Sequence, residues 1–146
     1  MLRFIDPILS PELLAILRQM GHGDEIAIVD ANFPAVTMGK RVVRADGVTA
    51  THMAEAILKL MPLDAFVSDV AFYMQQVHAP DEPAPVCVEF EGLVRQYGKG
   101  QFGMTAVERF AFYDRVQTCF AVVATAERRL YGNLILKKGV LQPDES

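Results

Sequence analysis

The segment that decides the fold is Gly21–Pro34, which reads GHGDEIAIVDANFP. It contains a polar loop, an apolar run over residues 26–29, and a carboxylate, Asp30, where that run ends. Four consecutive apolar residues predict a fully buried strand of a parallel sheet. Asp30 would then lie at the carboxyl end of this strand, where open α/β sheets bind their ligands.

A histidine lies just before this predicted strand, because His22 sits between two glycines. Imidazole titrates near neutral pH, and an imidazole and a carboxylate that meet at a cleft can transfer protons there. We therefore expect His22 and Asp30 to converge at one rim of the sheet. On the pattern alone, the alternative interpretation is that His22 is an ordinary loop imidazole and Asp30 a turn residue that ends a strand.

Other common ligand sites are not indicated. The segment Gly21-His22-Gly23 has Ile26 where a dinucleotide fingerprint needs its third glycine, and it precedes a strand where the fingerprint follows one. His22, Asp24 and Asp30 could together bind a divalent metal, but no set of His, Glu and Cys residues has the spacing of a zinc site. We expect no metal and no cofactor.

Composition narrows the classes of protein. The chain has 146 residues, of which 51% are hydrophobic and 22% charged, so a single domain with a real core is expected. A net charge of −4 without a basic block argues against nucleic acid and against a membrane surface as partner. No run reaches the roughly 18 apolar residues of a membrane span. Cys87 and Cys119 are far apart and form no CxxC motif, so we expect two buried thiols in a reducing cytoplasm.

The order of predicted elements gives the fold class. Ser10, Pro11 and Glu12 are typical of a helix start, and Gly21 would end that helix. Further helices are predicted near residues 49–61, 86–97 and 108–117, and strands near 25–29, 41–44, 66–77, 120–125 and 133–137. Residues 31–38 are predicted as a loop, and Gly98, Gly100 and Gly103 as the break after the third helix. Strands that alternate with helices indicate one three-layer α/β/α domain over residues 1–146, built around a mostly parallel sheet.

Short motifs recur along the chain in a fixed order. They are Ser10-Pro11-Glu12-Leu13-Leu14, Met20-Gly21-His22-Gly23-Asp24-Glu25, Asp30, Phe33-Pro34, Met38-Gly39, Arg44-Ala45-Asp46-Gly47, Arg109-Phe110-Ala111-Phe112-Tyr113, Tyr131-Gly132-Asn133 and Leu136-Lys137-Lys138-Gly139-Val140. In their order and spacing these motifs resemble the RbsD/FucU family over nearly the whole chain. The segments 109–113 and 131–133 are similar to the fucose branch of that family.

The resemblance implies an RbsD-like, Rossmann-like fold and a mutarotase that interconverts the α and β anomers of L-fucose without a cofactor. It implies that His22 is the proton donor. It also implies that Asp30, Arg109 and the segment Tyr131, Gly132 and Asn133 hold the sugar. A large homo-oligomer, such as a ring-like decamer with sites near subunit contacts, is implied as well.

The residues suit this reaction on their own terms. During anomer exchange a proton leaves the anomeric hydroxyl while another reaches the ring oxygen, the ring opens, and it closes on the other face. A histidine can donate and recover such a proton, and the Arg109 guanidinium can donate several hydrogen bonds in a fixed fork.

Two alternatives remain open. The first is a ribose-type pyranase or a mutarotase for another monosaccharide, since Asn32 and Ala126 depart from the residues expected in the fucose branch. The second is a sugar-binding accessory protein without catalysis.

Overall fold

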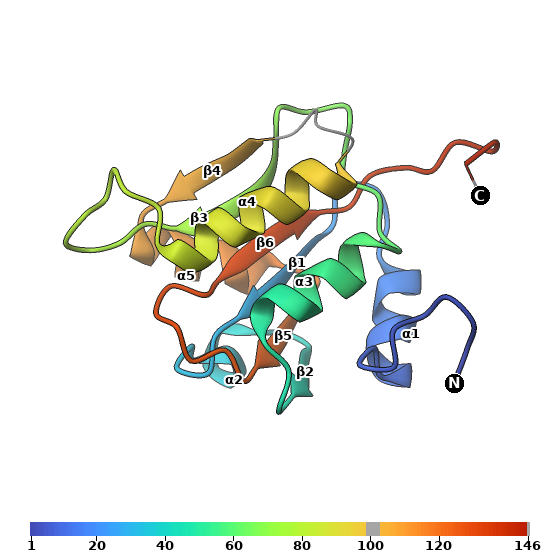
Figure 1. The fold of residues 1–146 in the computed structure, drawn as a ribbon, viewed down its shortest axis with the longest axis horizontal. Coiled ribbons are helices and arrows are strands. Elements are labelled where there is room, and N and C mark those ends of the chain that lie inside the picture. Colours follow the sequence, from blue (N-terminus) through green and yellow to red (C-terminus); the bar gives the residue numbers. More distant parts are fainter. Residues whose placement is uncertain (99–102, 146) are drawn as a thin grey trace.

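The computed structural model describes residues 1–98 and 103–145, which form one α/β domain around a six-stranded mixed sheet (Figure 1). The strands are β1 (Glu25–Val29), β2 (Val42–Ala45), β3 (Asp69–Met74), β4 (Gly103–Val107), β5 (Ala121–Thr125) and β6 (Leu134–Lys137). The helices are α1 (Pro11–Gln19), α2 (Ala35–Met38), α3 (Ala50–Leu58), α4 (Pro85–Tyr97) and α5 (Arg109–Thr118).

The strand order is β2-β5-β1-β6-β3-β4, and one strand runs against the others. The pairs β2–β5, β5–β1 and β3–β4 are parallel, whereas β6 is antiparallel to both of its neighbours, β1 and β3. In its register with β1, Lys137 lies opposite Glu25 and Leu134 opposite Ile28. The start of β6 therefore meets the end of β1, which matters for the site.

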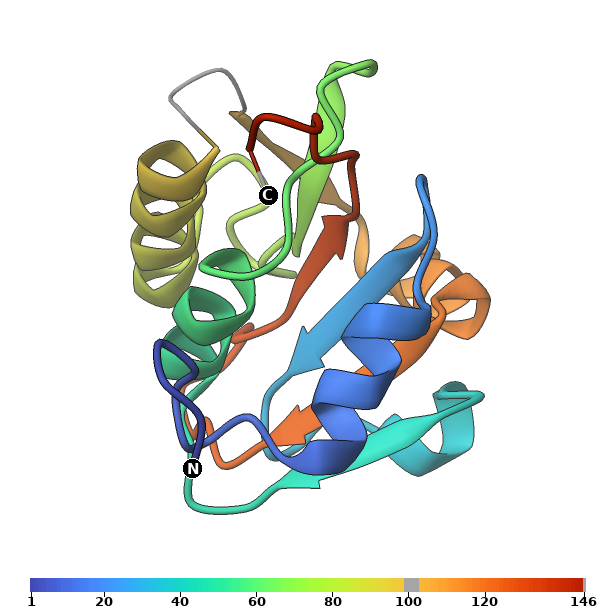
Figure 2. The same ribbon diagram turned by 90° about the vertical axis from the view of Figure 1, so that its right-hand side faces the viewer.

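Helices cover both faces of the sheet (Figure 2). Side chains alternate along a strand, so Ile26 and Ile28 join the core beneath α1, α3 and α4, whereas Ala27 and Val29 join the core beneath α2 and α5. All four side chains are fully buried. The apolar run is thus buried on both faces, as the sequence predicted.

Helix caps confirm part of the sequence prediction. The Leu13 N–H donates to Ser10 Oγ at 3.1 Å and the His52 N–H to Thr49 Oγ1 at 3.3 Å, which places Ser10 and Thr49 at the starts of α1 and α3. The end of α1 differs, because Met20 is its C-terminal cap and Gly21 lies one residue beyond.

Two local predictions were wrong. The predicted loop 31–38 contains the short helix α2, and Gly103 begins strand β4, where we had expected only a break after α4. Gly100 lies outside the described residues. The expected mostly parallel sheet is a mixed one, because β6 is inserted between two strands that run the opposite way.

Two further predictions from composition can be compared with the structure. Cys87 and Cys119 are both buried and free, and burial raises the pKa of each thiol to about 12. Across residues 1–98 and 103–145, the structure contains no helix with the length and apolar character of a membrane span.

Candidate active site

A buried polar pair marks the carboxyl end of β1. Asp30 follows β1 and Asn133 precedes β6, and the antiparallel pairing of these strands brings the two residues together. The Asn133 Nδ2 donates to Asp30 Oδ2 at 2.9 Å, and the Asp30 N–H donates to Asn133 Oδ1 at 2.9 Å. Both residues are buried, so this reciprocal pair satisfies polar groups that would otherwise be costly to bury.

Burial also changes the acidity of the Asp30 carboxyl group. Desolvation raises the pKa of Asp30, and hydrogen bonds from the Asn32 N–H and from Asn133 only partly oppose it. A carboxylate has about four acceptor positions, so one that receives few protein donors keeps capacity for a ligand hydroxyl.

The turn before β6 forms a second wall of the site. Tyr131 has a φ of 64°, which is rare for a residue other than glycine, and its hydroxyl accepts from the Val77 N–H at 3.1 Å. At Gly132 a Cβ atom would lie 2.6 Å from Glu127 Cγ and 3.4 Å from Asp30 Cβ. Gly132 is therefore required for the close approach of this turn to Glu127, while the contact with Asp30 is an ordinary van der Waals one.

The third component is Arg109, the first residue of α5. Glu108 caps this helix by accepting from the N–H groups of Phe110 and Ala111. In the part of the chain that the structure describes, Arg109 Nε is a buried nitrogen without a hydrogen-bond partner. Its guanidinium carbon lies 4.6 Å from the centre of the Phe110 ring. A buried cationic donor without a partner is expected to bind a ligand acceptor.

These groups line one cavity of about 210 Å³. Its walls are Asp30, Asn32, Phe33, Met74, Arg109, Tyr113, Leu130, Tyr131 and Asn133. The structure thus brings together four of the predicted site residues, and Gly132 supports the wall between two of them. A small cavity with aromatic walls and several hydrogen-bonding groups suits a polar ligand with apolar faces.

His22 lies elsewhere. It precedes β1, whereas Asp30 follows it, and at ~3.3 Å per residue the five residues of β1 separate the two side chains by roughly 16 Å or more. The expectation that His22 and Asp30 converge at one rim within the chain is therefore wrong. The physical reason is that the strand itself stands between them. For the same reason His22, Asp24 and Asp30 do not form a common metal site.

The partner of His22 is Asp64, which the sequence analysis did not single out. The His22 Nε2 and Asp64 Oδ1 lie 3.0 Å apart, with side-chain exposures of 48% and 4%. The His22 ring also contacts Phe66, with 5.5 Å between ring centres. Burial alone would raise the pKa of Asp64, but hydrogen bonds from the Phe66 N–H and from His22 outweigh it and leave the pKa below its usual value.

The loop that carries His22 is anchored on both sides. The Gly23 N–H donates to the Lys138 carbonyl at 2.8 Å, just past the end of β6. The Lys138 Nζ donates to the carbonyls of Leu17 and Met20, at the end of α1. His22 is therefore an accessible imidazole on a fixed loop, with a buried carboxylate that orients it.

No local pattern could have revealed Asp64. It follows the residue of an isolated β-bridge, Leu63 to Lys138, so its place beside His22 depends on the antiparallel insertion of β6. An acidic residue between a helix and a strand has no signature of its own in the sequence.

Comparison with known proteins places the chain in a family. Residues 3–141 match the RbsD / FucU transport protein family, and the chain belongs to it. It is 47% identical to fucose mutarotase of Homo sapiens, with 96% of this chain and 94% of the human protein covered. It is 44% identical to L-fucose mutarotase of Glaesserella parasuis serovar 5 (strain SH0165), with 96% of each covered.

A solved structure extends the likeness to three dimensions. The fucose mutarotase of Streptococcus pneumoniae, crystallised in complex with L-fucose, superimposes with a TM-score of 0.88 at 38% identity. The match covers 97% of this chain and all of the other. The fold described above is therefore that of a protein able to bind L-fucose.

Proposed function

We propose that this protein is an L-fucose mutarotase, an isomerase that interconverts the α and β anomers of the sugar. The observation that supports it best is one cavity lined by Arg109, which carries a buried nitrogen without a partner in the described structure, and by the Asp30–Asn133 pair. The names of the similar proteins from Homo sapiens and Glaesserella parasuis point to the same activity.

The residues divide the chemistry between them. Asp30 accepts hydrogen bonds from sugar hydroxyls, Arg109 donates to a sugar oxygen, and Tyr131 offers a ring face. His22 donates the proton that reaches the ring oxygen as the ring opens, and it recovers the proton on closure. Such acid–base assistance is typically worth ~10²–10⁴-fold in rate, which suits a reaction that proceeds slowly in water without an enzyme.

The separation of His22 from the cavity implies that one chain holds only half of each site. A homo-oligomer in which His22 of one copy reaches the cavity of the next completes the site, and a ring-like assembly such as a decamer meets this need. Large apolar side chains are exposed beside both halves, namely Phe66 near His22 and Phe110 and Leu130 near the cavity. Exposed apolar side chains at such places are typical of subunit contacts.

A cytoplasmic location is part of the proposal. Buried free thiols such as Cys87 and Cys119 persist in a reducing compartment.

Exchange NMR tests the function directly. Magnetisation transfer between the anomers of L-fucose should accelerate with added protein at concentrations that leave D-ribose unaffected. Faster exchange for D-ribose would indicate a pyranase. Binding of L-fucose in calorimetry, with exchange no faster than in buffer, would indicate a sugar-binding accessory protein.

A further inference from the structure

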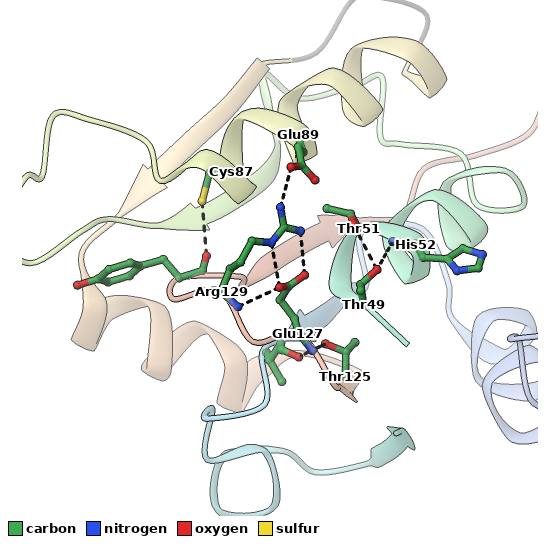
Figure 3. Close-up of polar contacts among 10 residues, drawn as sticks. Thr49, Thr51, His52, Cys87, Glu89, Thr125, Glu127 and Arg129 are labelled. Atoms are coloured by element: carbon green, nitrogen blue, oxygen red, sulfur yellow. Dashed lines mark hydrogen bonds and ion pairs between the residues drawn. The ribbon is translucent and has the colours of Figure 1, made fainter. Parts of the chain in front are cut away.

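A buried ion pair lies behind the turn that carries Tyr131 and Asn133. The side chain of Glu127 is only 4% exposed, and both of its oxygens accept from Arg129 (Figure 3). Glu127 Oε1 accepts from the Arg129 N–H at 3.0 Å and from Nε at 2.9 Å, and Oε2 accepts from Nη2 at 2.9 Å. Such a bidentate pair fixes both side chains in one geometry.

Arg129 also links this pair to α4. Its Nη1 donates to Glu89 Oε1 at 2.6 Å, on the exposed side of the guanidinium (Figure 3). Backbone groups tie Glu127 to the strands as well, because its carbonyl accepts from the Ala31 N–H and its own N–H donates to Thr125 Oγ1. Glu127 is therefore connected to the end of β5, to the residue after Asp30 and to a helix.

The side chain of Glu127 packs directly on the turn. A Cβ at position 132 would lie 2.6 Å from Glu127 Cγ and 3.4 Å from Asp30 Cβ, so both acidic residues pack against Gly132. A displacement of Glu127 would leave the turn without support on one side. Asn133, the partner of Asp30, is the next residue.

The backbone of this turn adopts a strained conformation at Tyr131, which contacts with surrounding residues must stabilise. Tyr131, at a φ of 64°, is stable there only if its surroundings determine the backbone. Its carbonyl accepts from Cys87 Sγ at 3.5 Å and from the Asn133 N–H at 2.7 Å, and its side chain packs against the hydrophobic cores on the two faces of the sheet. The bidentate Glu127–Arg129 pair is a further constraint beside this turn, because Glu127 packs against Gly132.

We propose that Glu127, held by Arg129, is a positioning residue of the sugar cavity, which fixes the turn Tyr131–Asn133 against Asp30. This inference rests on the proposed function. Hydrogen bonds from Arg129 hold the pKa of Glu127 below its usual value, so the pair stays charged at neutral pH while His22 exchanges protons at the other end of β1.

The variant Glu127→Gln tests the inference because it keeps the shape and removes the charge. We expect KM for L-fucose to rise about tenfold while kcat changes less than about twofold, since the turn binds sugar and His22 is untouched. The matched control is Glu89→Gln, which breaks only the exposed link to α4 and should change KM less than about twofold. A merely structural role for Glu127 would lower the melting temperature and leave KM unchanged in the folded protein.

A second readout needs no sugar and no activity. In the ligand-free protein, the side-chain amide resonances of Asn133 should shift in Glu127→Gln and stay in place in Glu89→Gln. If wild-type protein shows no anomer exchange, the proposed function fails, and these resonances still decide the inference. If Glu127→Gln does not fold, Arg129→Gln, whose side chain is 42% exposed, should give the same rise and shift. Unchanged KM and unchanged Asn133 resonances in a folded variant of either residue would overturn the inference.

Discussion

The two ends of β1 carry the two halves of the candidate site, and they are built differently. At the amino end, a half-exposed His22 is held by one buried carboxylate, Asp64, on a loop at the surface. At the carboxyl end, Asp30 and Asn133 are buried together beneath a small cavity. The first arrangement presents an imidazole to the outside, and the second encloses a small cavity lined by hydrogen-bonding groups.

The two acidic residues also differ in acidity. Hydrogen bonds outweigh burial at Asp64 and leave its pKa below the usual value, whereas burial dominates at Asp30 and raises its pKa. The comparison teaches that hydrogen bonds from a backbone N–H and an imidazole can keep a buried carboxyl group acidic, whereas burial prevails where the hydrogen bonds only partly oppose it. The predictions below test whether the two ends really have these separate roles.

The largest effect is expected from His22→Ala. Loss of the proton donor should slow anomer exchange of L-fucose by ~10²–10⁴-fold, as measured by magnetisation transfer, with the fold intact. The matched control is His52→Ala. His52 Nε2 also lies 3.0 Å from a carboxylate oxygen, that of Asp6, and its side chain is 49% exposed. Exchange at the wild-type rate in His22→Ala would contradict the assignment of the proton donor.

The separation of the halves can be tested by mixing two variants, each impaired in one half of the site. His22→Ala keeps an intact cavity, and Arg109→Ala keeps an intact His22. If each site combines His22 of one copy with the cavity of another, random co-assembly at equal amounts should restore roughly one quarter of wild-type exchange. The measurement is exchange NMR on subunits refolded together and, as the control, on the same subunits refolded separately. Activity equal to the sum of the separate variants would show that each site lies within one chain.

A smaller effect is expected at the cavity itself. Arg109→Gln should weaken L-fucose binding by about 10–100-fold in calorimetry, because a charged donor contributes roughly 1.5–3 kcal/mol to a hydrogen bond. Thermal stability should be retained, since in the described structure the Nε atom of Arg109 has no protein partner to lose. Arg95→Gln, which removes an exposed arginine paired with Glu91, is the control for the change in charge. Unaltered affinity in Arg109→Gln would remove the guanidinium from the binding site.

The smallest effect concerns stability in acid. Asp64 has a lowered pKa, so its contribution to stability is present above its unfolded value of 3.8 and is lost as the pH falls through the folded-state pKa. Asp30 has a raised pKa, so its ionisation costs stability, and that cost disappears as the pH falls through its folded-state value. The measurement is the free energy of urea unfolding between about pH 3 and 6. As the pH falls, Asp64→Asn should lose stability less steeply than the wild-type protein below pH 3.8. Asp30→Asn should lose stability more steeply than the wild-type protein above pH 3.8.

Asp81→Asn, in the exposed connection before α4, is the control for net charge in this series. If Asp64→Asn and Asp30→Asn changed the pH dependence of the free energy of unfolding in the same way, the two carboxylates would not differ as described.

Local patterns predicted much of the fold. Ser10 was recognisable as the start of a helix, and the run Ile26–Val29 as a buried strand, because these signals depend on neighbours in sequence. The strand Gly103–Val107 was missed since it begins with glycine and its residues are only partly buried at the edge of the sheet. The direction of β6 could not be predicted, because strand direction depends on which strands it pairs with.

The site was predictable only in its parts. Motif resemblance named Asp30, Arg109, Tyr131, Gly132 and Asn133, and the structure brings them to one cavity. It could not reveal that Asp64 orients His22, because that contact follows from the pairing of β6. The separation of His22 from Asp30 follows from the length of β1, which the sequence had already placed between them. The roles of these residues in binding and catalysis stay predictions.

The antiparallel strand β6 begins beside Asn133 and ends beside Lys138, so it supports the cavity at one end and the His22 loop at the other. Among the described strands it is also the last in sequence order, although it lies in the middle of the sheet and pairs with the earlier strands β1 and β3. A nascent chain that stops before it would have two half-sheets with nothing between them. Neither half of the site can form before β6 has been synthesised, so a product terminated ahead of β6 would lack the support of both halves at once.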